Sequence, residues 1–526
     1  MRIFKKKNSH PGEPSVKSTP KSTPKNTHQV VLRGRNFLSS RLLHLPTELI
    51  LKIFGHTADW GPGSSSLVLT AICYKLREIA LAFPQLWDVV NFTTPSLAEM
   101  FLKRCNYEPR LFYITESQII PEGRSSRSVA DDPRWRAVWK KLEGRTFNDL
   151  RSFVYEGVPN TFVDMVVGVL RRAPNIATID LRYRSPPHQE LPWSLDNPLP
   201  NLSTLRLRGF WISWTSPLLS RNLRHLTLDF GIVRHLPEDT TIETFLTTLD
   251  NCSDIEILDL AFAGPDLLTE HQDNCARVVQ LRKLRELSLM FHGPSRIQQI
   301  LSHIEYPEST AVKLEASIDT ETELPEAIAN LFTPRIIETF QRRKANTLTV
   351  RLDGVHTFFT DNLFVRIFSH GSVRPRHTPQ ALSHFASKIT DVVGSNNITS
   401  LSVQSWYASF PEPIWDVFLP GFPRLERIRY DLEMGMGDER VADPFIMIFS
   451  QHFEGGLVCP QLQHLELPQR VISQGPSAIV LKRVLAERSA LGKRLKRLGL
   501  SSDVRERDVT ALEAFRDLVE EIVGDP

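Results

Sequence analysis

A short apolar pattern that recurs along most of the chain constrains its fold more than any other feature. The pattern is φxxφxφ, where φ is an apolar or aromatic residue. Clear copies end at Tyr155, Leu181, Leu207, Leu228, Leu260, Leu289, Val403, Tyr430, Leu467 and Leu500, and weaker copies end at Leu314 and Leu352. From the first copy to the sixth, successive end points are 26, 26, 21, 32 and 29 residues apart. An internal repeat of this length indicates a stack of similar structural units.

The alternation within φxφ predicts a short strand with one face buried in each unit. Stretches such as 243–249 and 297–304 can supply the return helices. One strand and one helix in about 20–29 residues are typical of leucine-rich repeats. Such units cannot bury their apolar faces alone, so they must stack. We therefore predict an α/β fold in which residues 149–503 form an irregular leucine-rich-repeat solenoid, or horseshoe.

Two irregularities qualify this prediction. The asparagine that usually follows the strand in leucine-rich repeats is mostly absent, and the step from Leu352 to Val403 is 51 residues. We therefore expect an insertion around 354–395. An ordinary α/β domain whose buried strands are rich in leucine is the alternative.

The residues between the φ positions are expected to line the concave face of such a solenoid. Their mixed charges on a rigid sheet suit recognition of another protein. The target-binding candidates are Asp180, Arg182, Arg206, Arg208, Asp229, Asp259, Arg429 and Asp431, with Thr227, Ser288, Ser402 and Glu466 as polar neighbours. A solvated strand face without a ligand is the alternative for each single residue.

Residues 42–90 carry a different, helical periodicity. Pro46 suits the first turn of a helix because it has no N–H group to leave without a partner. The apolar residues around it, at positions 45, 49, 50, 53 and 54, predict one apolar helical face. A Gly/Ser-rich linker over 59–66 separates this helix from a second one, which ends at Phe83-Pro84. Fewer than about 50 residues cannot bury this much apolar surface by themselves, so the C-terminal domain or another protein must cover part of it.

This arrangement resembles an F-box, particularly the version found in large fungal families. The resemblance rests on Leu45-Pro46-x-Glu48-Leu49 with Ile53-Phe54, and on the run Cys73–Ala80 followed by Pro84-x-Leu86-Trp87. Leu76 stands where the family usually carries a tryptophan. The matching segment covers about a tenth of the chain.

The resemblance implies that the chain is the substrate receptor of an SCF-type ubiquitin ligase. The F-box would dock on the adaptor subunit, and through it on a cullin, while the repeats bind an unknown target protein. The residues that the resemblance assigns to the adaptor contact or its immediate support are Leu45, Pro46, Leu49, Ile53, Phe54, Ile72, Leu76 and Trp87. The periodicity alone leaves open a helical hairpin that only caps a solenoid.

The flanking segments complete the expected organisation. Residues 1–40 are a basic tail for which we expect disorder, because it has too few apolar residues to form a core. Residues 91–148 are expected to form a connector with a helix, a strand and a loop, and 504–526 a C-terminal helix. The tail suggests an alternative function, a non-catalytic scaffold that associates with chromatin.

The sequence offers no constellation for catalysis, so we expect neither an enzyme nor a cofactor. The five cysteines are widely spaced and the histidines are scattered, which indicates no metal site and no disulfide framework. The net charge of +3 argues against nucleic acid as the main partner. No stretch approaches the roughly 20 apolar residues of a membrane helix. We expect a location in the cytoplasm or the nucleus.

Overall fold

A computed structural model describes the larger part of the chain. The described residues are 41–57, 67, 70–115, 132–157, 159–183, 189–190, 199–231, 241–265, 277–318, 330–332, 334–342, 345–352, 355–360, 363–369, 379–394, 397–405, 412–432, 444–449, 452–453, 456–468, 475–500 and 513–523. The basic tail, the linker over 59–66 and residues 116–131 of the expected connector lie outside them. The described part falls into two compact units, residues up to Asn91 with Leu97–Pro109, and Phe92–Ser96 with Arg110 onward.

The first unit is mainly helical. In chain order its elements are η1 (Arg41–His44), α2 (Thr47–Thr57), α4 (Tyr74–Ala82), η3 (Pro84–Trp87), β1 (Val89–Asn91) and α5 (Pro95–Arg104). The Pro46 carbonyl accepts hydrogen bonds from the amides of Leu49 and Ile50, so α2 starts directly after the proline. Five side chains form the core of the α2–α4 pair: Leu43, Ile50, Phe54, Leu76 and Ile79.

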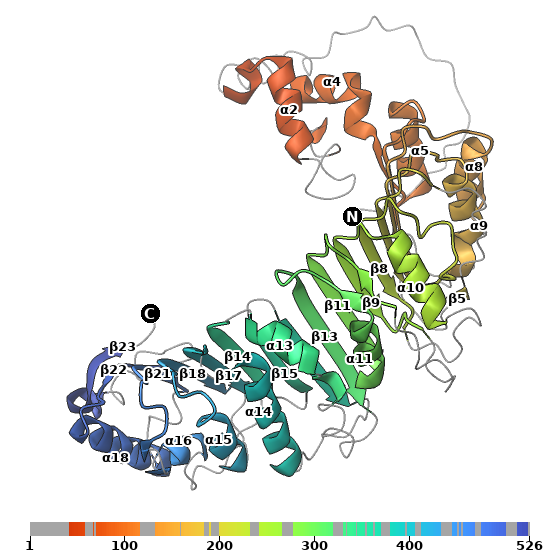
Figure 1. The fold of residues 1–526 in the computed structure, drawn as a ribbon. Helices are drawn as coiled ribbons and strands as arrows, with labels where there is room; N and C mark the ends of the chain where they lie inside the picture. Colours follow the sequence, from red (N-terminus) through yellow and green to blue (C-terminus); the bar gives the residue numbers. More distant parts are fainter. Residues whose placement is uncertain are drawn as a thin grey trace, which may run out of the picture. The chain divides into compact units, whose positions relative to one another are not determined.

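The second unit contains a large, mostly parallel sheet, part of a sheet of 17 strands among the described residues (Figure 1). Its strands are β2 (Leu111–Thr115), β3 (Ser152–Gly157), β4 (Thr178–Tyr183), β6 (Thr204–Arg208), β8 (His225–Asp229), β9 (Ile257–Ala261), β11 (Glu286–His292), β13 (Ala311–Ile318), β14 (Thr347–Leu352), β15 (Val355–Thr360), β16 (Leu363–Ser369), β17 (Ser400–Ser405), β18 (Arg427–Leu432), β21 (His464–Leu467), β22 (Leu495–Leu500) and β23 (Val519–Val523). Short pairs form at β5–β7 (Gln189–Glu190 and Phe210–Trp211), β10–β12 (Val279–Gln280 and Ile304–Glu305) and β19–β20 (His452–Phe453 and Gly456–Leu457). The α/β class predicted from the repeat is confirmed.

Helices connect many of the strands. They are α8 (Pro133–Leu142), α9 (Pro159–Leu170), α10 (Ile242–Asn251), α11 (Pro294–Ser302), α13 (Pro334–Arg342), α14 (Pro379–Val393), α15 (Glu412–Phe418), α16 (Pro444–Ile448) and α18 (Pro476–Ala490), with the 3-10 turn η6 (Arg516–Leu518). Seven of the nine α-helices begin at a proline, whose fixed φ and missing N–H suit the first helical position. Neighbouring helices from α13 to α18 pack side by side, so the helices form a layer of their own.

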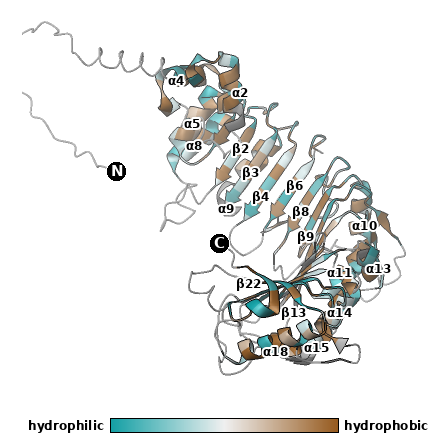
Figure 2. Ribbon diagram, turned by 90° about the vertical axis from the view of Figure 1, so that its left-hand side faces the viewer, coloured by the Kyte–Doolittle hydropathy of each residue, from teal (hydrophilic) through white to brown (hydrophobic). Residues whose placement is uncertain are grey.

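The φ positions of the repeat form the core of this unit. The strand register places Leu207, Leu228 and Leu260 opposite one another on successive parallel strands, and each is fully buried. Polar residues alternate with them along β4 and β6, as the hydropathy colours of Figure 2 show. Each buried leucine contributes about 1.5–3 kcal/mol relative to exposure, so the repeated pattern supplies much of the stability. The prediction that each copy forms a strand is confirmed.

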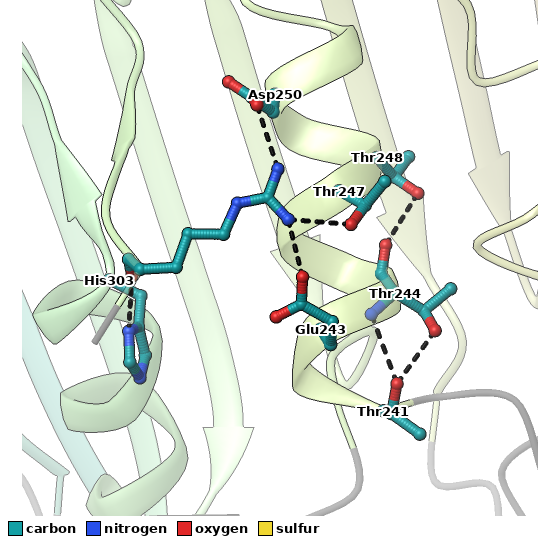
Figure 3. A network of polar contacts seen from close by, with 8 residues as sticks. Thr241, Glu243, Thr244, Thr247, Thr248, Asp250 and His303 are labelled. Carbon is teal, nitrogen blue, oxygen red and sulfur yellow. Dashed lines mark hydrogen bonds and ion pairs between the residues drawn. The ribbon is translucent and has the colours of Figure 1, made fainter. Parts of the chain in front are cut away.

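A network of polar contacts connects neighbouring helices of the second unit (Figure 3). Arg277 binds three residues of α10: Glu243 at 2.7 Å, Thr247 at 2.9 Å and Asp250 at 2.9 Å. The ring of His303, directly after α11, lies 2.9 Å from the Arg277 carbonyl oxygen. One arginine therefore fixes the chain before β10 to two neighbouring helices.

The 51-residue step in the repeat contains an extra hairpin inside the sheet. β14, β15 and β16 form an antiparallel meander, and β16 pairs in parallel with β13 while β14 pairs in parallel with β17. The spatial order is therefore β13, β16, β15, β14, β17. The insertion expected around 354–395 consists, in its described part, of β15, β16 and helix α14.

The prediction of a C-terminal helix over 504–526 is wrong for its described part. Arg516–Leu518 form a 3-10 turn, and Val519–Val523 form strand β23, which pairs in parallel with β22. The edge of β22 offers backbone N–H and C=O groups that need partners. Pairing with that edge outweighs the helical preference of this segment.

Candidate protein-binding surfaces

The eight adaptor-contact candidates separate into two groups in the first unit. Pro46, Leu49, Ile53 and Ile72 are exposed, and Leu49, Ile53 and Ile72 keep 47%, 40% and 59% of their surface accessible. Phe54, Leu76 and Trp87 are buried, and Leu45 is half-buried against the core.

Only part of the apolar face predicted for α2 is buried in the hairpin. Ile50 and Phe54 point into the core, whereas Leu49 and Ile53 remain accessible one helical turn apart. Adjacent positions differ by about 100° around a helix, so two apolar stripes can lie side by side. One stripe builds the hairpin and the other is left on the surface.

Exposed apolar side chains are concentrated in this small unit. Nine large hydrophobic side chains are strongly exposed among the described residues, and five of them lie between positions 49 and 81. Tyr74 and Leu81 on α4, with 48% and 47% accessible surface, join the three residues above. Apolar surface gathered in one place is a mark of protein interaction sites.

Trp87 supports this unit from inside. Its ring is fully buried, meets Phe101 of α5 edge-on at 5.2 Å between centroids, and lies 4.0 Å under the Arg104 guanidinium. Its indole N–H donates to the carbonyl of Ala80 at 2.7 Å. The Lys75 ammonium also donates to the Leu43 carbonyl at 2.5 Å. These bonds fix both ends of α4.

The target-binding candidates lie on the face of the large sheet opposite the buried φ side chains, which we call the open face. Its residues are aligned in rows by the parallel register. One row runs from Asp180 through Arg206, Thr227 and Asp259 to Ser288, and the next runs from Arg182 through Arg208 to Asp229. The structure therefore brings the first six candidates together on four neighbouring strands, β4, β6, β8 and β9.

Asp180 is the centre of a first ion-pair cluster. Its side chain is only 5% exposed and accepts from Arg182 at 2.7 and 2.9 Å, with Arg206 at 3.9 Å. The hydrogen bond to Asp180 raises the pKa of Arg182. Asp229 accepts instead from the backbone amide of Gly231 at 3.0 Å. Among the described residues, Arg208 and Asp259 form no ion pair.

The remaining two candidates form a second cluster farther along the sheet. Arg429 bonds Asp431 at 2.8 Å and lies 3.8 Å from Glu466 on the neighbouring strand. His464, in the same strand as Glu466, has a lowered pKa because of burial and the nearby charges of Arg427, Arg497 and Lys496.

Sequence reasoning missed a third cluster. Glu315 of β13 is 3% exposed and pairs with Lys313 on its own strand and with Arg366 of β16, which lies 3.4 Å away. The repeat copy at β13 is a weak one and β16 belongs to the insertion, so neither strand was assigned a face in advance. The alternation of Lys313, Leu314 and Glu315 is the signal that could have found the pair.

In all three clusters the carboxylate is less exposed than the cations that pair with it. The carboxylates of Asp180, Glu315 and Asp431 are 5%, 3% and 15% exposed. The cations paired with them, Arg182, Arg206, Lys313, Arg366 and Arg429, are between 42% and 50% exposed. The acids therefore lie on the floor of the open face and the hydrogen-bond donors rise above them.

The described residues were also compared with the requirements of a metal site, a membrane helix and a reactive thiol. Within them, no group of three or more His, Cys, Asp and Glu side chains is placed to hold a metal ion, and no helix is long and apolar enough to cross a membrane. Burial raises the pKa of the Cys105 thiol to about 11 and that of Cys252 to about 12, so neither thiol ionises readily near neutral pH. Comparison with protein-family models and with curated protein sequences gives no match.

Proposed function

We propose that this protein is a substrate-receptor subunit of an SCF-type ubiquitin ligase. The first unit is the F-box and docks on the adaptor, and the leucine-rich-repeat solenoid of the second unit binds the target on its open face. Catalysis is left to the ubiquitin-conjugating enzyme that the complex brings close to the target. The protein works as a bridge and needs no active site of its own.

The observation that carries this proposal is the exposed apolar surface of α2 and α4. Leu49 and Ile53 of α2, with Ile72, occupy positions that the F-box resemblance assigns to the adaptor contact, and they are left accessible by a hairpin that has a separate core. Insertion of an apolar helical face into a partner's groove is a recurrent mode of recognition. The buried candidates Phe54, Leu76 and Trp87 then act as the support of that surface.

Co-expression with the SCF adaptor tests the proposal. We expect a 1:1 complex in size-exclusion chromatography, and we expect Leu49→Asp with Ile53→Asp to abolish it. Ile479→Asp on α18 is the matched control, because Ile479 is 72% exposed and lies in the other unit. A folded chain that never co-elutes with the adaptor would favour the scaffold alternative, in which the hairpin is only a cap.

A further inference from the structure

The cluster around Glu315 occupies the middle of the large sheet. One row of the open face runs from Met290 on β11 through Glu315 and Arg366 to Thr357 and Arg351, across five neighbouring strands. Adjacent strands are about 4.8 Å apart, so Arg351 lies about 10 Å along the sheet from Arg366. Lys313 and Arg366 therefore lie over one buried acid, and Arg351 stands farther along the same row.

The two cations that flank Glu315 are held by it and are partly accessible to solvent. Lys313 and Arg366 are 49% and 43% exposed, and each is bound to a different oxygen of Glu315. Glu315 thus holds both side chains in place while part of each remains accessible to solvent.

The surroundings of the cluster add apolar surface. Lys313 stands 5.5 Å from the ring centroid of Phe364, and Met290 lies directly opposite Glu315 on β11; both apolar side chains are partly accessible. The nearest acidic open-face positions among the described strands are Asp259 on β9 and Glu286 at the start of β11. The region therefore combines accessible cations with aromatic and thioether surface.

We infer that this central region, made of Lys313, Arg366, Arg351, Phe364 and Met290, binds an acidic segment of a target polypeptide. The inference rests on the proposed function as a target receptor and specifies the chemistry of the target. Carboxylates of the segment accept from Lys313 and Arg366, and its apolar side chains pack on Phe364 and Met290. Charge-assisted hydrogen bonds of this kind are among the strongest in proteins.

The same geometry is a poor match for nucleic acid. Recognition of a phosphate backbone uses a continuous stripe of cations that are free to neutralise it. On this open face the paired cations occur in three separate groups, each above a buried carboxylate, and acidic residues such as Asp259 stand between the first two groups. A polypeptide can place a few carboxylates at chosen positions, whereas a phosphate backbone repeats its charge at every step.

A binding experiment on the full-length chain tests the inference. Fluorescence anisotropy measures the affinity for labelled decaglutamate, with labelled decaglutamine as the neutral probe and single-stranded decathymidylate as the nucleic-acid probe. We expect decaglutamate to bind best and its affinity to fall with added salt. Lys313→Gln with Arg366→Gln should weaken this binding at least about tenfold, the effect of losing about 1.4 kcal/mol.

A charge-matched control separates the local effect from net charge. Lys283→Gln with Arg342→Gln removes the same two charges from side chains that are 58% and 59% exposed, on the turn before β11 and on α13. This control should bind decaglutamate as the native chain does. Equal weakening in both double variants, absent decaglutamate binding by the folded native chain, or tighter binding of decathymidylate would each overturn the inference.

Adaptor co-elution measured on the same preparations keeps the two proposals distinguishable. A native chain that co-elutes with the adaptor but ignores decaglutamate overturns only the inference about the target. A chain that binds decaglutamate through Lys313 and Arg366 but does not bind the adaptor supports the acidic-segment surface and overturns the receptor proposal.

Discussion

Truncation of the two exposed apolar residues of α2 gives the sharpest test of how the first unit works. Leu49 and Ile53 keep 47% and 40% of their surface accessible. Full burial of such a side chain is worth about 1.5–3 kcal/mol, so burial of the accessible half in the adaptor contributes about 1 kcal/mol per residue. Leu49→Ala with Ile53→Ala should therefore cost about 2 kcal/mol, a roughly thirtyfold rise in Kd.

The structure also predicts what this variant leaves unchanged. Both side chains lie outside the core, so the free energy of unfolding should change by less than about 0.5 kcal/mol. The neighbouring pair Ile50→Ala and Phe54→Ala is the contrast, because these residues are 0% and 2% exposed. Each of those truncations should cost about 2–5 kcal/mol of stability through a cavity in the core.

Isothermal titration calorimetry with the purified adaptor measures the Kd, and urea unfolding measures the stability. Our reasoning would be refuted if the folded Leu49→Ala, Ile53→Ala chain bound the adaptor within about twofold of the native affinity. It would also be refuted if that variant were as unstable as one truncated at Ile50 or Phe54, because the two stripes of α2 would then not differ in role.

Three further perturbations test the packing and the electrostatics. Trp87→Ala should destabilise the first unit by about 3–5 kcal/mol, visible as a lower thermal midpoint, because a fully buried ring is removed. Glu315→Gln should lower the free energy of unfolding in urea by about 1–3 kcal/mol, since two cations lose their common acceptor. The lowered pKa of His464, due to burial and to cations such as Arg427 and Arg497, means that the unfolded chain takes up its proton first as the pH falls. As the pH falls below about 6.5 toward the lowered folded pKa, the free energy of unfolding of the native chain should therefore decrease more than that of His464→Gln. Parallel pH profiles of urea unfolding for the two proteins would contradict this.

The strands of the large sheet could be predicted from the sequence because a local residue pattern specifies each of them. Alternation in φxφ specifies which side chains are buried and therefore where a strand runs, and β4, β6, β8 and β9 lie where the pattern places them. The spatial order β13, β16, β15, β14, β17 was not within reach, because pairing between distant strands depends on edges that exist only in the folded chain. The same holds for β23, which a local reading assigned to a helix.

The surfaces show the same division. The sequence by itself determined that α2 is apolar and that charged residues alternate with the leucines of the sheet. Only the tertiary structure decided that Ile50 faces the core while Leu49 faces solvent, because helical spacing does not say which of two adjacent stripes meets a partner. It also decided that Glu315 lies beneath Lys313 and Arg366, since burial of a charge depends on neighbours from other strands that come together only when the sheet forms.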